Sequence, residues 1–352
     1  MTVCYFGLFR PDYVRNQALI KALRVSGVTV LEVSDRSKGF AKYLRLFAKH
    51  WKVRSRYDLM IVGFPGQSIV PFARLLTRKP IVFDALVSLY DSVVIERKQC
   101  SSASFRGRWC FLLDWLSARL ATTILLDTRE HAAYYSKLLS IPEGKCWVVY
   151  HGCDDAVFYP HPAKRDETKF VVEFHGYITP TNGMDFVMRA MKLLSGKPYE
   201  LRIIGGGQEY GRMQDLAREL GLSSVQFFPA MPRERLLPFI SQARAGLGFF
   251  NNRSGRVQRV IANKIYEMMA LKIPVVTADS PAIRELFTHR ENIYVCQPGD
   301  PHAIAEALEE LRNSEKLRSS IANNAYVYYK NNLVPTSVGR SFVTKLASLI
   351  TK

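Results

Sequence analysis

Short apolar runs alternate along the chain with segments whose apolar residues recur at helical spacing. The runs are rich in β-branched residues, which is typical of strands that are buried on both faces of a parallel sheet. Strands are predicted at residues 2–8, 28–33, 58–63, 80–84, 122–127, 146–150, 170–177, 199–205, 225–228, 245–250, 274–278 and 293–296. Helices are predicted between them, notably at 15–26, 208–220, 233–243, 263–271 and 301–312, and from about 315 to 350 with a break near Pro335.

This alternation occurs twice, so the sequence predicts an α/β protein with two Rossmann-like, doubly wound parallel-sheet domains. The segment 151–169 contains two prolines and clustered charges without apolar periodicity, and it is interpreted as a linker. We therefore expect a first domain at 1–160, joined by a C-terminal helix at 335–352, and a second at 161–334. Ligands of open α/β sheets bind at the carboxyl ends of the strands, so a cleft between two facing sheets is the expected site.

Length and composition agree with this organisation. A chain of 352 residues has room for two domains, and its 48% hydrophobic and 23% charged residues exclude a disordered or fibrous protein. No stretch approaches the roughly 18 apolar residues of a membrane-spanning helix. Arg10 and Asp12 follow the first apolar run too early for a signal peptide. We therefore expect a cytoplasmic location, with attachment to the inner face of the membrane as the variant considered below.

The formal net charge is +18, and residues 1–150 contribute 23 basic against 11 acidic side chains. Such an excess favours anionic partners, which are nucleic acid, an anionic membrane surface or phosphorylated substrates. The six cysteines form neither a C-x-x-C pair nor a cluster with histidines at zinc spacing. Reduced thiols and no metal site are expected.

The segment 251–285 is the most informative for chemistry. A polar loop with Arg253, Arg256 and Arg259 follows an apolar strand, and a helix is predicted to begin near Asn263, a suitable N-cap. Free N–H groups at that terminus, with Lys264 beside them, suit a diphosphate. Lys264 and Glu267 share one helix face, where a cation for phosphate and a carboxylate for a sugar diol would hold a nucleotide. The alternative is a surface ion pair of little consequence.

The wider pattern of this region resembles a known family. NKIYEMMALKIPVVTADSPAIREL is similar to the donor-binding segment of the family 4 (group 1) glycosyltransferases. VVYHGCDDAVFYP (148–160), FHGYITPTNGMDFVMRAM (174–191), residues 199–247 and QPGDPHAIAEALEEL (297–311) follow in the family's order. The resemblance covers about 145–330 well and the first domain loosely.

The resemblance implies a GT-B fold, with the donor nucleotide sugar bound by the second domain and the acceptor by the first. It also implies a hexosyltransferase that retains anomeric configuration without a cofactor and usually without a metal. By motif match, Glu267 binds the ribose hydroxyls, the base lies near Ala230 and Met231, and Gly176, Tyr177 and Gly205 flank the donor. Asn263, Lys264, Arg253, Arg256 and Arg259 complete the expected donor site.

The chain departs from the family pattern in two respects. Arg259 stands where the family often has the first of two glutamates, eight residues before Glu267. The family's phosphate-binding Arg and Lys are replaced by Tyr177–Ile178 and Asn182, so the arginines of the 251–259 loop or Lys264 would have to supply the positive charge. Donor sugar, acceptor, linkage and oligomeric state are not specified by these residues, nor is the effect of Arg259 on activity.

In the first domain, the loop after the first strand contains the acceptor-side candidates Arg10, Asp12, Tyr13 and Arg15. Asp84 ends another strand, where the family often has a cleft His or Asp. Asp84 and Lys264 are therefore the candidate catalytic groups, and the alternative for Asp84 is a cap on the following helix.

Residues 36–56 form a basic amphipathic segment. Phe40, Leu44, Phe47 and Trp51 recur at helical spacing, and no acidic residue lies between 36 and 57. Such a helix can lie in an anionic membrane interface, which would favour a lipid-linked acceptor. The alternative is an ordinary helix with its apolar stripe in the core.

The function expected from these features is a retaining glycosyltransferase of glycan or polysaccharide biosynthesis, acting on a lipid-linked or cell-surface glycan precursor. One alternative is a basic nucleic-acid-binding protein, although neither a recognition helix nor an exposed aromatic strand face is evident, and no nucleic-acid partner is expected. A sugar-nucleotide epimerase or phosphorylase of the same fold is the other. GGGQEYG (205–211) departs from the dinucleotide fingerprint, and His175 is interpreted as a core or supporting residue rather than a metal ligand.

Overall fold

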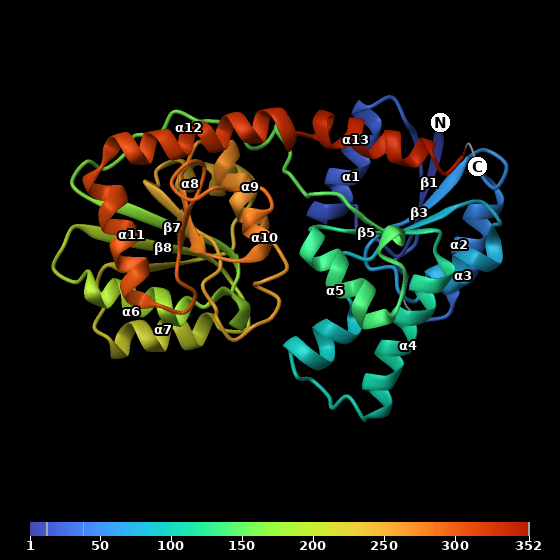
Figure 1. Ribbon diagram of the computed structural model, residues 1–352, viewed down its shortest axis with the longest axis horizontal. Coiled ribbons are helices and arrows are strands. Elements are labelled where there is room, and N and C mark those ends of the chain that lie inside the picture. Colours follow the sequence, from blue (N-terminus) through green and yellow to red (C-terminus); the bar gives the residue numbers. More distant parts are fainter. Residues whose placement is uncertain (12, 38, 351–352) are drawn as a thin grey trace. The chain divides into compact units, whose positions relative to one another are not determined.

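The protein forms two compact α/β units in a computed structural model that describes residues 1–11, 13–37 and 39–350 (Figure 1). The first unit comprises Met1–His151 and Pro335–Lys352, and the second comprises Gly152–Val334. Within the described residues, each unit contains one parallel sheet of six strands. The predicted fold class is therefore confirmed. Its facing cleft stays a prediction.

The first sheet has the strand order β2-β1-β3-β4-β5-β6. Its strands are β1 (Thr2–Gly7), β2 (Thr29–Ser34), β3 (Leu59–Val62), β4 (Ile81–Asp84), β5 (Thr123–Leu126) and β6 (Cys146–Val148). Its helices are α1 (Val14–Val25), α2 (Ala41–Trp51), α3 (Val70–Leu76), α4 (Phe105–Leu120), α5 (Arg129–Leu139) and α13 (Pro335–Ala347), with short helical turns η1 (Asp91–Glu96) and η2 (Glu143–Lys145).

Helices cover both faces of this sheet. One face carries α2, α3, α4 and α5, whose buried residues Leu46, Ala73, Ala118 and Tyr135 belong to one apolar cluster. The other face carries α1 and α13. A Cβ on Gly339 of α13 would lie only 2.2 Å from the Ala22 carbonyl oxygen, so glycine allows α13 to pack closely on α1. The C-terminal helix consequently belongs to the first unit.

The second sheet has the order β12-β11-β10-β7-β8-β9. Its strands are β7 (Phe170–Tyr177), β8 (Tyr199–Gly206), β9 (Val225–Pro229), β10 (Ala245–Leu247), β11 (Val275–Ala278) and β12 (Tyr294–Cys296). Its helices are α6 (Met184–Leu193), α7 (Tyr210–Glu219), α8 (Arg233–Ser241), α9 (Asn263–Ala270), α10 (Pro281–Arg284), α11 (Pro301–Asn313) and α12 (Glu315–Asn332), with a short turn η3 (Pro180–Asn182). The strand order reverses between β7 and β10, which makes this edge the expected ligand site of the sheet.

The boundary between the units lies at residues 151 and 152, nine residues before the predicted one. The cause is the packing of the segment interpreted as a linker. Cys153 is buried and donates from Sγ to the Tyr266 carbonyl oxygen at 3.5 Å, while Tyr329 Oη donates to the Cys153 carbonyl oxygen at 3.2 Å. The start of the segment is thus held by α9 and α12 of the second unit.

Two further expectations can be compared with the structure. The strand predicted at 245–250 ends at Leu247, because the Phe250 N–H donates to the Asn182 carbonyl oxygen (2.9 Å) and not to a strand neighbour. Among the described residues, the cysteines are all free and no cluster of His, Cys, Asp or Glu could hold a metal ion. None of the helices described here has both the length and the apolar composition that crossing a membrane requires.

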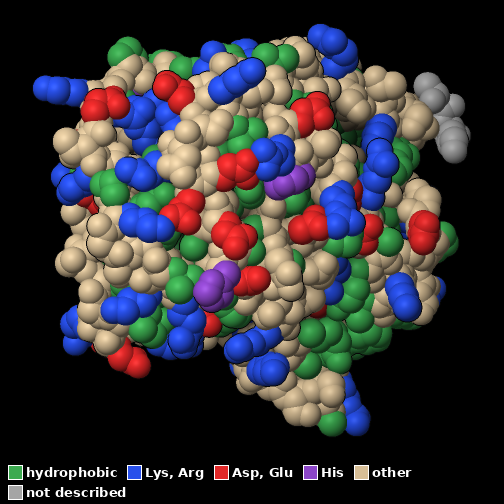
Figure 2. Space-filling view, turned by 60° about the vertical axis from the view of Figure 1, so that its left-hand side comes forward, with side chains coloured by type: hydrophobic (Ala, Val, Ile, Leu, Met, Phe, Trp, Pro, Cys, Tyr) green, Lys and Arg blue, Asp and Glu red, His purple; other side chains and the backbone are tan. Residues whose placement is uncertain are grey.

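The basic excess is not concentrated on the face shown in Figure 2. There, Lys and Arg side chains are interspersed with Asp and Glu. That distribution differs from the continuous basic stripe that follows a nucleic-acid backbone.

Candidate functional site

The carboxyl ends of β7 and β8 are lined by glycines. Gly176 and Gly205 have φ angles of +116° and +146°, and a Cβ on Gly205 would lie 2.1 Å from the Gly176 carbonyl oxygen. Only glycine permits this approach. Tyr177, after Gly176, is 68% exposed, and Ala230 and Met231 follow the neighbouring strand β9 without being buried. The edge of the sheet is therefore open where the donor-binding positions were predicted.

Helix α9 places two of the predicted donor residues beside this edge. Lys264 is buried, and its Nζ lies 3.1 Å from the centroid of the Phe174 ring. A Cβ built on Gly176 would lie 3.9 Å from the same Nζ, so the absence of a side chain at Gly176 keeps the surroundings of Lys264 open. Because Lys264 is buried, the alternative of a surface ion pair with Glu267 is wrong.

Asn263 was predicted to cap this helix, and that prediction is wrong. Ala262 is the N-cap residue and makes no side-chain capping bond, while Asn263 is the first helical residue. The first N–H groups of α9 consequently lack a side-chain cap from residue 262, which agrees with a role for this terminus in binding an anion.

A buried histidine holds the predicted ribose-binding carboxylate. His175 Nε2 lies 2.6 Å from Glu267 Oε2, and its Nδ1 lies 3.0 Å from Glu173 Oε2. Glu173 is fully buried within β7, whereas the Glu267 side chain is 12% exposed. The ring of His175 therefore holds Glu267 through its Oε2 atom, and a small part of the Glu267 side chain stays exposed.

Glu173, His175, Lys264 and Glu267 form a cluster of four charges in which the pKa of His175 is raised and that of Lys264 is lowered. Burial would lower the pKa of His175, but the carboxylates of Glu173 and Glu267 outweigh it and raise the pKa to about 9. Burial lowers the pKa of Lys264 to about 7, although the same two carboxylates oppose the fall. Near neutral pH the imidazole of His175 is therefore charged. Lys264 is partly deprotonated at this pH, and a nearby anion would raise its pKa so that it takes up a proton from the solvent.

The three arginines of the preceding loop do not all lie at the terminus of α9. The Arg253 guanidinium lies 5.8 Å from the ring of Phe186, which is in the first turn of α6. A Cβ on Gly255 would lie 3.0 Å from Arg259 Nη1, so Arg259 folds back over its own loop. Arg256 is half-buried in that loop, and its carbonyl oxygen accepts from the Arg259 N–H at 3.0 Å.

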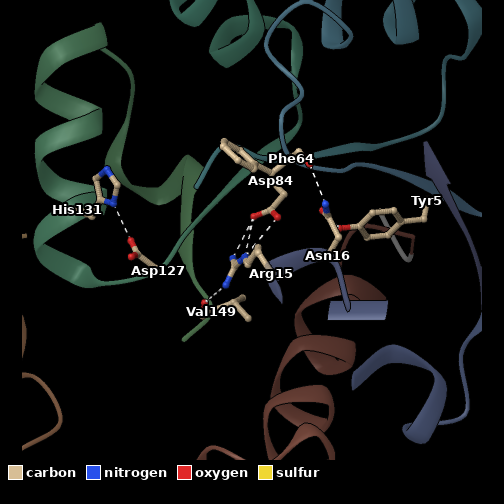
Figure 3. A network of polar contacts seen from close by, with 8 residues as sticks. All are labelled: Tyr5, Arg15, Asn16, Phe64, Asp84, Asp127, His131 and Val149. Carbon is tan, nitrogen blue, oxygen red and sulfur yellow. Dashed lines mark hydrogen bonds and ion pairs between the residues drawn. The ribbon is translucent and has the colours of Figure 1, made fainter. Parts of the chain in front are cut away.

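In the first unit, Asn16 organises the strand-end loops at the edge between β1 and β3. Its side-chain nitrogen donates to the Phe64 carbonyl oxygen at 2.8 Å, and its oxygen accepts from Tyr5 Oη (Figure 3). The same nitrogen donates to the Arg10 carbonyl oxygen at 3.1 Å. Tyr13 is exposed and packs on the Phe64 ring. Arg10 is exposed too, whereas Asp12 lies outside the described residues.

Arg15 and Asp84 form a fully buried ion pair (Figure 3). Arg15 Nη2 and Nε each lie 3.1 Å from Asp84 Oδ1, and Nη1 donates to the Val149 carbonyl oxygen at 2.7 Å. Burial raises the pKa of Asp84 and Arg15 opposes the rise. Asp84 is thus neither a helix cap nor exposed for catalysis, and Arg15 is not exposed to an acceptor. Both expectations are corrected because each side chain completes the other's burial.

Two buried histidines, His131 and His151, lie near this ion pair, and His131 contacts Asp127. His131 Nδ1 is 2.6 Å from Asp127 Oδ1, and both side chains are buried. Burial, with Arg15, lowers the pKa of His151 to about 3, and its Nδ1 has no hydrogen-bond partner. These side chains keep the carboxyl ends of β5 and β6 polar inside the unit.

The apolar stripe predicted for 36–56 faces outward. Phe40, Leu44, Phe47 and Trp51 are all exposed, and Phe40 reaches 74%. The side of α2 that packs on the sheet carries Leu46 and His50 instead. The alternative of a stripe in the core is therefore wrong.

Sequence reasoning missed Glu173 and the surface of α4. A carboxylate within the apolar run FVVEF was the available signal for Glu173, since a charge in a buried strand needs a partner. The spacing of Phe105, Trp109 and Leu112, with Arg106 and Arg108 between them, was the signal for α4.

Solved structures of other proteins share this fold. Solved structures with the same architecture include Anabaena HepE in complex with UDP and glucose (16% identical, TM-score 0.74, covering 99% of this chain and all of the other). A sucrose-phosphate synthase from Thermosynechococcus elongatus is 12% identical with a TM-score of 0.76, and covers 100% of this chain and 99% of the other. The chain has the GT-B fold.

The family match is confined to one unit. Residues 158–328, which lie within the second unit, match the family model of the group 1 glycosyl transferases. CapM of Staphylococcus aureus, a capsular polysaccharide biosynthesis glycosyltransferase, is 25% identical over 159 residues, which are 44% of this chain and 40% of CapM. An uncharacterized glycosyltransferase of Haemophilus influenzae is 26% identical over 146 residues (40% of this chain, 39% of the other). The chain thus spans less than half the length of these curated relatives.

Replacing Asp84 should separate a structural from a chemical role. Asp84→Ala leaves the Arg15 charge buried without its partner, and we expect the first unit to lose about 3–5 kcal/mol of stability. The double variant Arg15→Met/Asp84→Leu should recover most of that loss, because a packed apolar pair needs no compensation. All four tryptophans lie in the first unit, so urea unfolding followed by tryptophan fluorescence measures it selectively. A double variant as unstable as the single one would contradict the assignment.

Single variants at His175 and Lys264 should give opposite pH slopes of stability. The pKa of His175 is raised from 6.5 to about 9, so its contribution is complete below pH 6.5 and is lost as pH rises through 9. The pKa of Lys264 is lowered from 10.5 to about 7, so stability rises with pH between those values. The two pH ranges overlap between about 7 and about 9. Across this overlap, and relative to the parent, Lys264→Met should lose stability as the pH rises and His175→Gln should gain stability. Each change should reach at most about 1.4 kcal/mol per pH unit.

The measurement is the circular-dichroism transition of the second unit, which contains no tryptophan and therefore unfolds without a fluorescence change. Glu306→Ala, an exposed carboxylate of α11, is the matched control and should leave the slope unchanged. Parallel slopes for His175→Gln and Lys264→Met would show that the four charges are not coupled in this way.

Proposed function

We propose that this protein is a glycosyltransferase that moves a sugar from a nucleotide-diphosphate sugar to an acceptor. The observation that carries the proposal lies within the segment that matches the group 1 family. There, the N-terminus of α9, the buried Lys264 and the largely buried Glu267 converge on the glycine-lined ends of β7 and β8. A positive helix end beside a lysine and a carboxylate suits a diphosphate joined to a ribose.

Each group has a role in holding the donor. Glu267 accepts hydrogen bonds from the ribose hydroxyls, while His175 keeps its other side occupied. Lys264 and the first N–H groups of α9 bind the diphosphate, with Arg256 and Arg259 adding positive charge from the loop. The backbone at Ala230 and Met231 borders the base, and Gly176, Tyr177 and Gly205 let the phosphates approach the strand ends.

The reaction retains the anomeric configuration in this proposal. The bond between the anomeric carbon and the leaving phosphate oxygen breaks, and the acceptor oxygen bonds to that carbon on the same face. The acceptor proton passes to the departing phosphate oxygen, so no protein base is required. Lys264 and the α9 terminus stabilise the developing charge of the diphosphate, which is electrostatic catalysis by preorganised groups. No metal is needed for this step, because the protein supplies the compensating charge.

The donor and acceptor classes follow by analogy. HepE was crystallised with UDP-glucose, so a UDP-hexose is the first donor to examine. CapM is named for capsular polysaccharide biosynthesis, which favours a glycan precursor as acceptor. The exposed stripe of α2, with its cations, favours a lipid-linked acceptor at the inner face of the membrane. We propose that the protein is cytoplasmic and attaches peripherally to the inner face of the membrane.

Binding of nucleotides to the second unit tests this proposal. A thermal-shift comparison of uridine, guanosine, adenosine and thymidine diphosphates should identify one ligand, since a ligand at 100 times its Kd adds about 2.7 kcal/mol of stability. Glu267→Ala should weaken that ligand about tenfold to a hundredfold, because bonds to a charged acceptor contribute about 1.5–3 kcal/mol. Glu306→Ala should bind like the parent. Unchanged affinity in Glu267→Ala, or no shift with any nucleotide, would refute the donor site.

Donor binding should also take up a proton. At about pH 8 Lys264 is mostly neutral in the empty site, and an adjacent diphosphate raises its pKa, so close to one proton should be absorbed. Calorimetric titration in two buffers of different ionisation enthalpy measures this uptake. It should disappear in Lys264→Met and fall at about pH 6, where the lysine is already protonated. Equal uptake in the parent and in Lys264→Met would place the diphosphate elsewhere.

A further inference from the structure

A second apolar stripe lies on α4, in the helix layer that also contains α2. Phe105, Trp109 and Leu112 recur at spacings of four and three, so they share one side of the helix. All three are exposed, and Phe105 reaches 83%. The opposite side of α4 carries the buried Cys110, Asp114 and Ser117. The stripe therefore faces away from the core, and no described residue of the sheet packs against it as a core neighbour.

The helices that carry the two stripes belong to one layer of the first unit. The helices α2, α3 and α4 cover the same face of the sheet and lie in this order in Figure 1. Tyr43 of α2 contacts Phe72 of α3 edge to face, and Arg74 of α3 donates to the Leu120 carbonyl oxygen of α4 at 3.2 Å. Leu75, on the intervening α3, is 86% exposed. The outer surface of this layer thus presents apolar side chains from three neighbouring helices.

Both stripes have the same local construction. Phe105 and Trp109 are stacked with ring planes 11° apart, and Phe47 and Trp51 are stacked with ring centroids 5.7 Å apart. The Arg54 guanidinium lies 3.8 Å from the Trp51 ring. Exposed aromatic pairs beside cations are the composition of segments that lie at the headgroup level of a bilayer.

The charge around the stripes specifies the partner. No acidic residue occurs between 97 and 113, where Arg97, Lys98, Arg106 and Arg108 are exposed. Around α2 the cations Lys52, Arg54 and Arg56 are exposed, although Lys49 is paired with Asp35 and the exposed Asp58 follows Arg56 by two residues. Each cation near an anionic bilayer contributes about a fivefold increase in affinity. A protein partner would more commonly meet a mixed polar rim.

We propose that α2 and the N-terminal half of α4 form one docking face for an anionic lipid bilayer, in which α4 supplies a second point of insertion. This inference rests on the membrane part of the proposed function and extends it to residues outside 36–56. Ser104 caps α4, with its Oγ accepting from the Gly107 N–H at 3.1 Å, so the stripe starts on a formed helical turn. Two insertion points on one rigid layer orient the first unit on the membrane, which a single helix cannot do.

Vesicle binding by the full chain tests the inference. The probes are phosphatidylcholine vesicles and vesicles of phosphatidylcholine and phosphatidylglycerol in equal parts, with co-sedimentation as the measurement. The variant Phe105→Ser/Trp109→Ser should bind the mixed vesicles at least about tenfold more weakly than the parent. Phe40→Ser/Phe47→Ser should show a comparable loss, and the four substitutions together a larger loss than either pair. Leu193→Ser/Val327→Ser, two exposed apolar residues of the second unit, is the matched control and should bind like the parent.

Charge-neutralising variants on α4 and α6 distinguish specific binding to anionic lipid from non-specific adsorption. Arg106→Gln/Arg108→Gln should weaken binding to the mixed vesicles by up to about 25-fold, whereas Arg189→Gln/Lys192→Gln on α6 should not. Parent binding should be much weaker on pure phosphatidylcholine. Full binding by Phe105→Ser/Trp109→Ser would overturn the role of α4, and so would concentration-dependent self-association without vesicle binding, which would assign the face to a second copy.

Nucleotide binding distinguishes failure of this inference from failure of the proposed function. The α2 and α4 variants should bind the selected nucleoside diphosphate with the affinity of the parent, because their substitutions lie in the first unit. Lost vesicle binding with retained nucleotide binding supports the docking face. Retained vesicle binding in every variant refutes the docking face and leaves the donor site unaffected.

Discussion

The candidate donor site depends on one buried imidazole held between two carboxylates. Without the charge of His175, the fully buried Glu173 would lose the cation that contacts its carboxylate, and Glu267 would lose its 2.6 Å contact with the imidazole. Burying an ionised carboxylate is costly unless a cation compensates it. The imidazolium therefore stabilises the local structure and at the same time orients the carboxylate expected to bind the ribose.

Lys264 is the second buried cation of this arrangement, and its pKa shifts in the direction opposite to that of His175. Its ammonium is as buried as the imidazole, yet its pKa falls to about 7 while that of His175 rises to about 9. The difference arises because the histidine contacts both carboxylates directly, whereas the lysine head lies over the Phe174 ring. A lysine that is readily deprotonated in the empty site and readily protonated beside a diphosphate can respond to the arrival of the donor. Tyr177–Ile178 and Asn182 stand where the resemblance leads us to expect a phosphate-binding Arg and Lys, so in the proposed function Lys264 supplies more of the positive charge for the diphosphate.

The two units use their buried charges differently. In the second unit the charges lie beside open, glycine-lined strand ends and leave part of Glu267 exposed. In the first unit Arg15 and Asp84 neutralise each other completely inside the protein, and Asn16 fastens the loops at the strand ends. The polar residues of the first unit thus maintain the shape of the strand ends, while its exposed aromatic residues lie on the outer helix layer. The proposed donor site and the proposed docking face therefore lie in different units.

The sequence by itself determined the secondary structure and the fold class. The twelve predicted strands all occur, because short β-branched runs between helical segments have few other ways to be buried. It also placed Lys264 and Glu267 on one helix, since their spacing is local. Tertiary structure decided the partners of each charge. Glu173 and His175 are two residues apart in a strand, but Glu267 reaches them from 92 residues further along the chain. Arg15 and Asp84 are 69 residues apart, and only packing shows that they neutralise each other. The outward orientation of α2 is equally a tertiary fact, because periodicity identifies an apolar stripe and cannot say whether the sheet or the solvent lies against it.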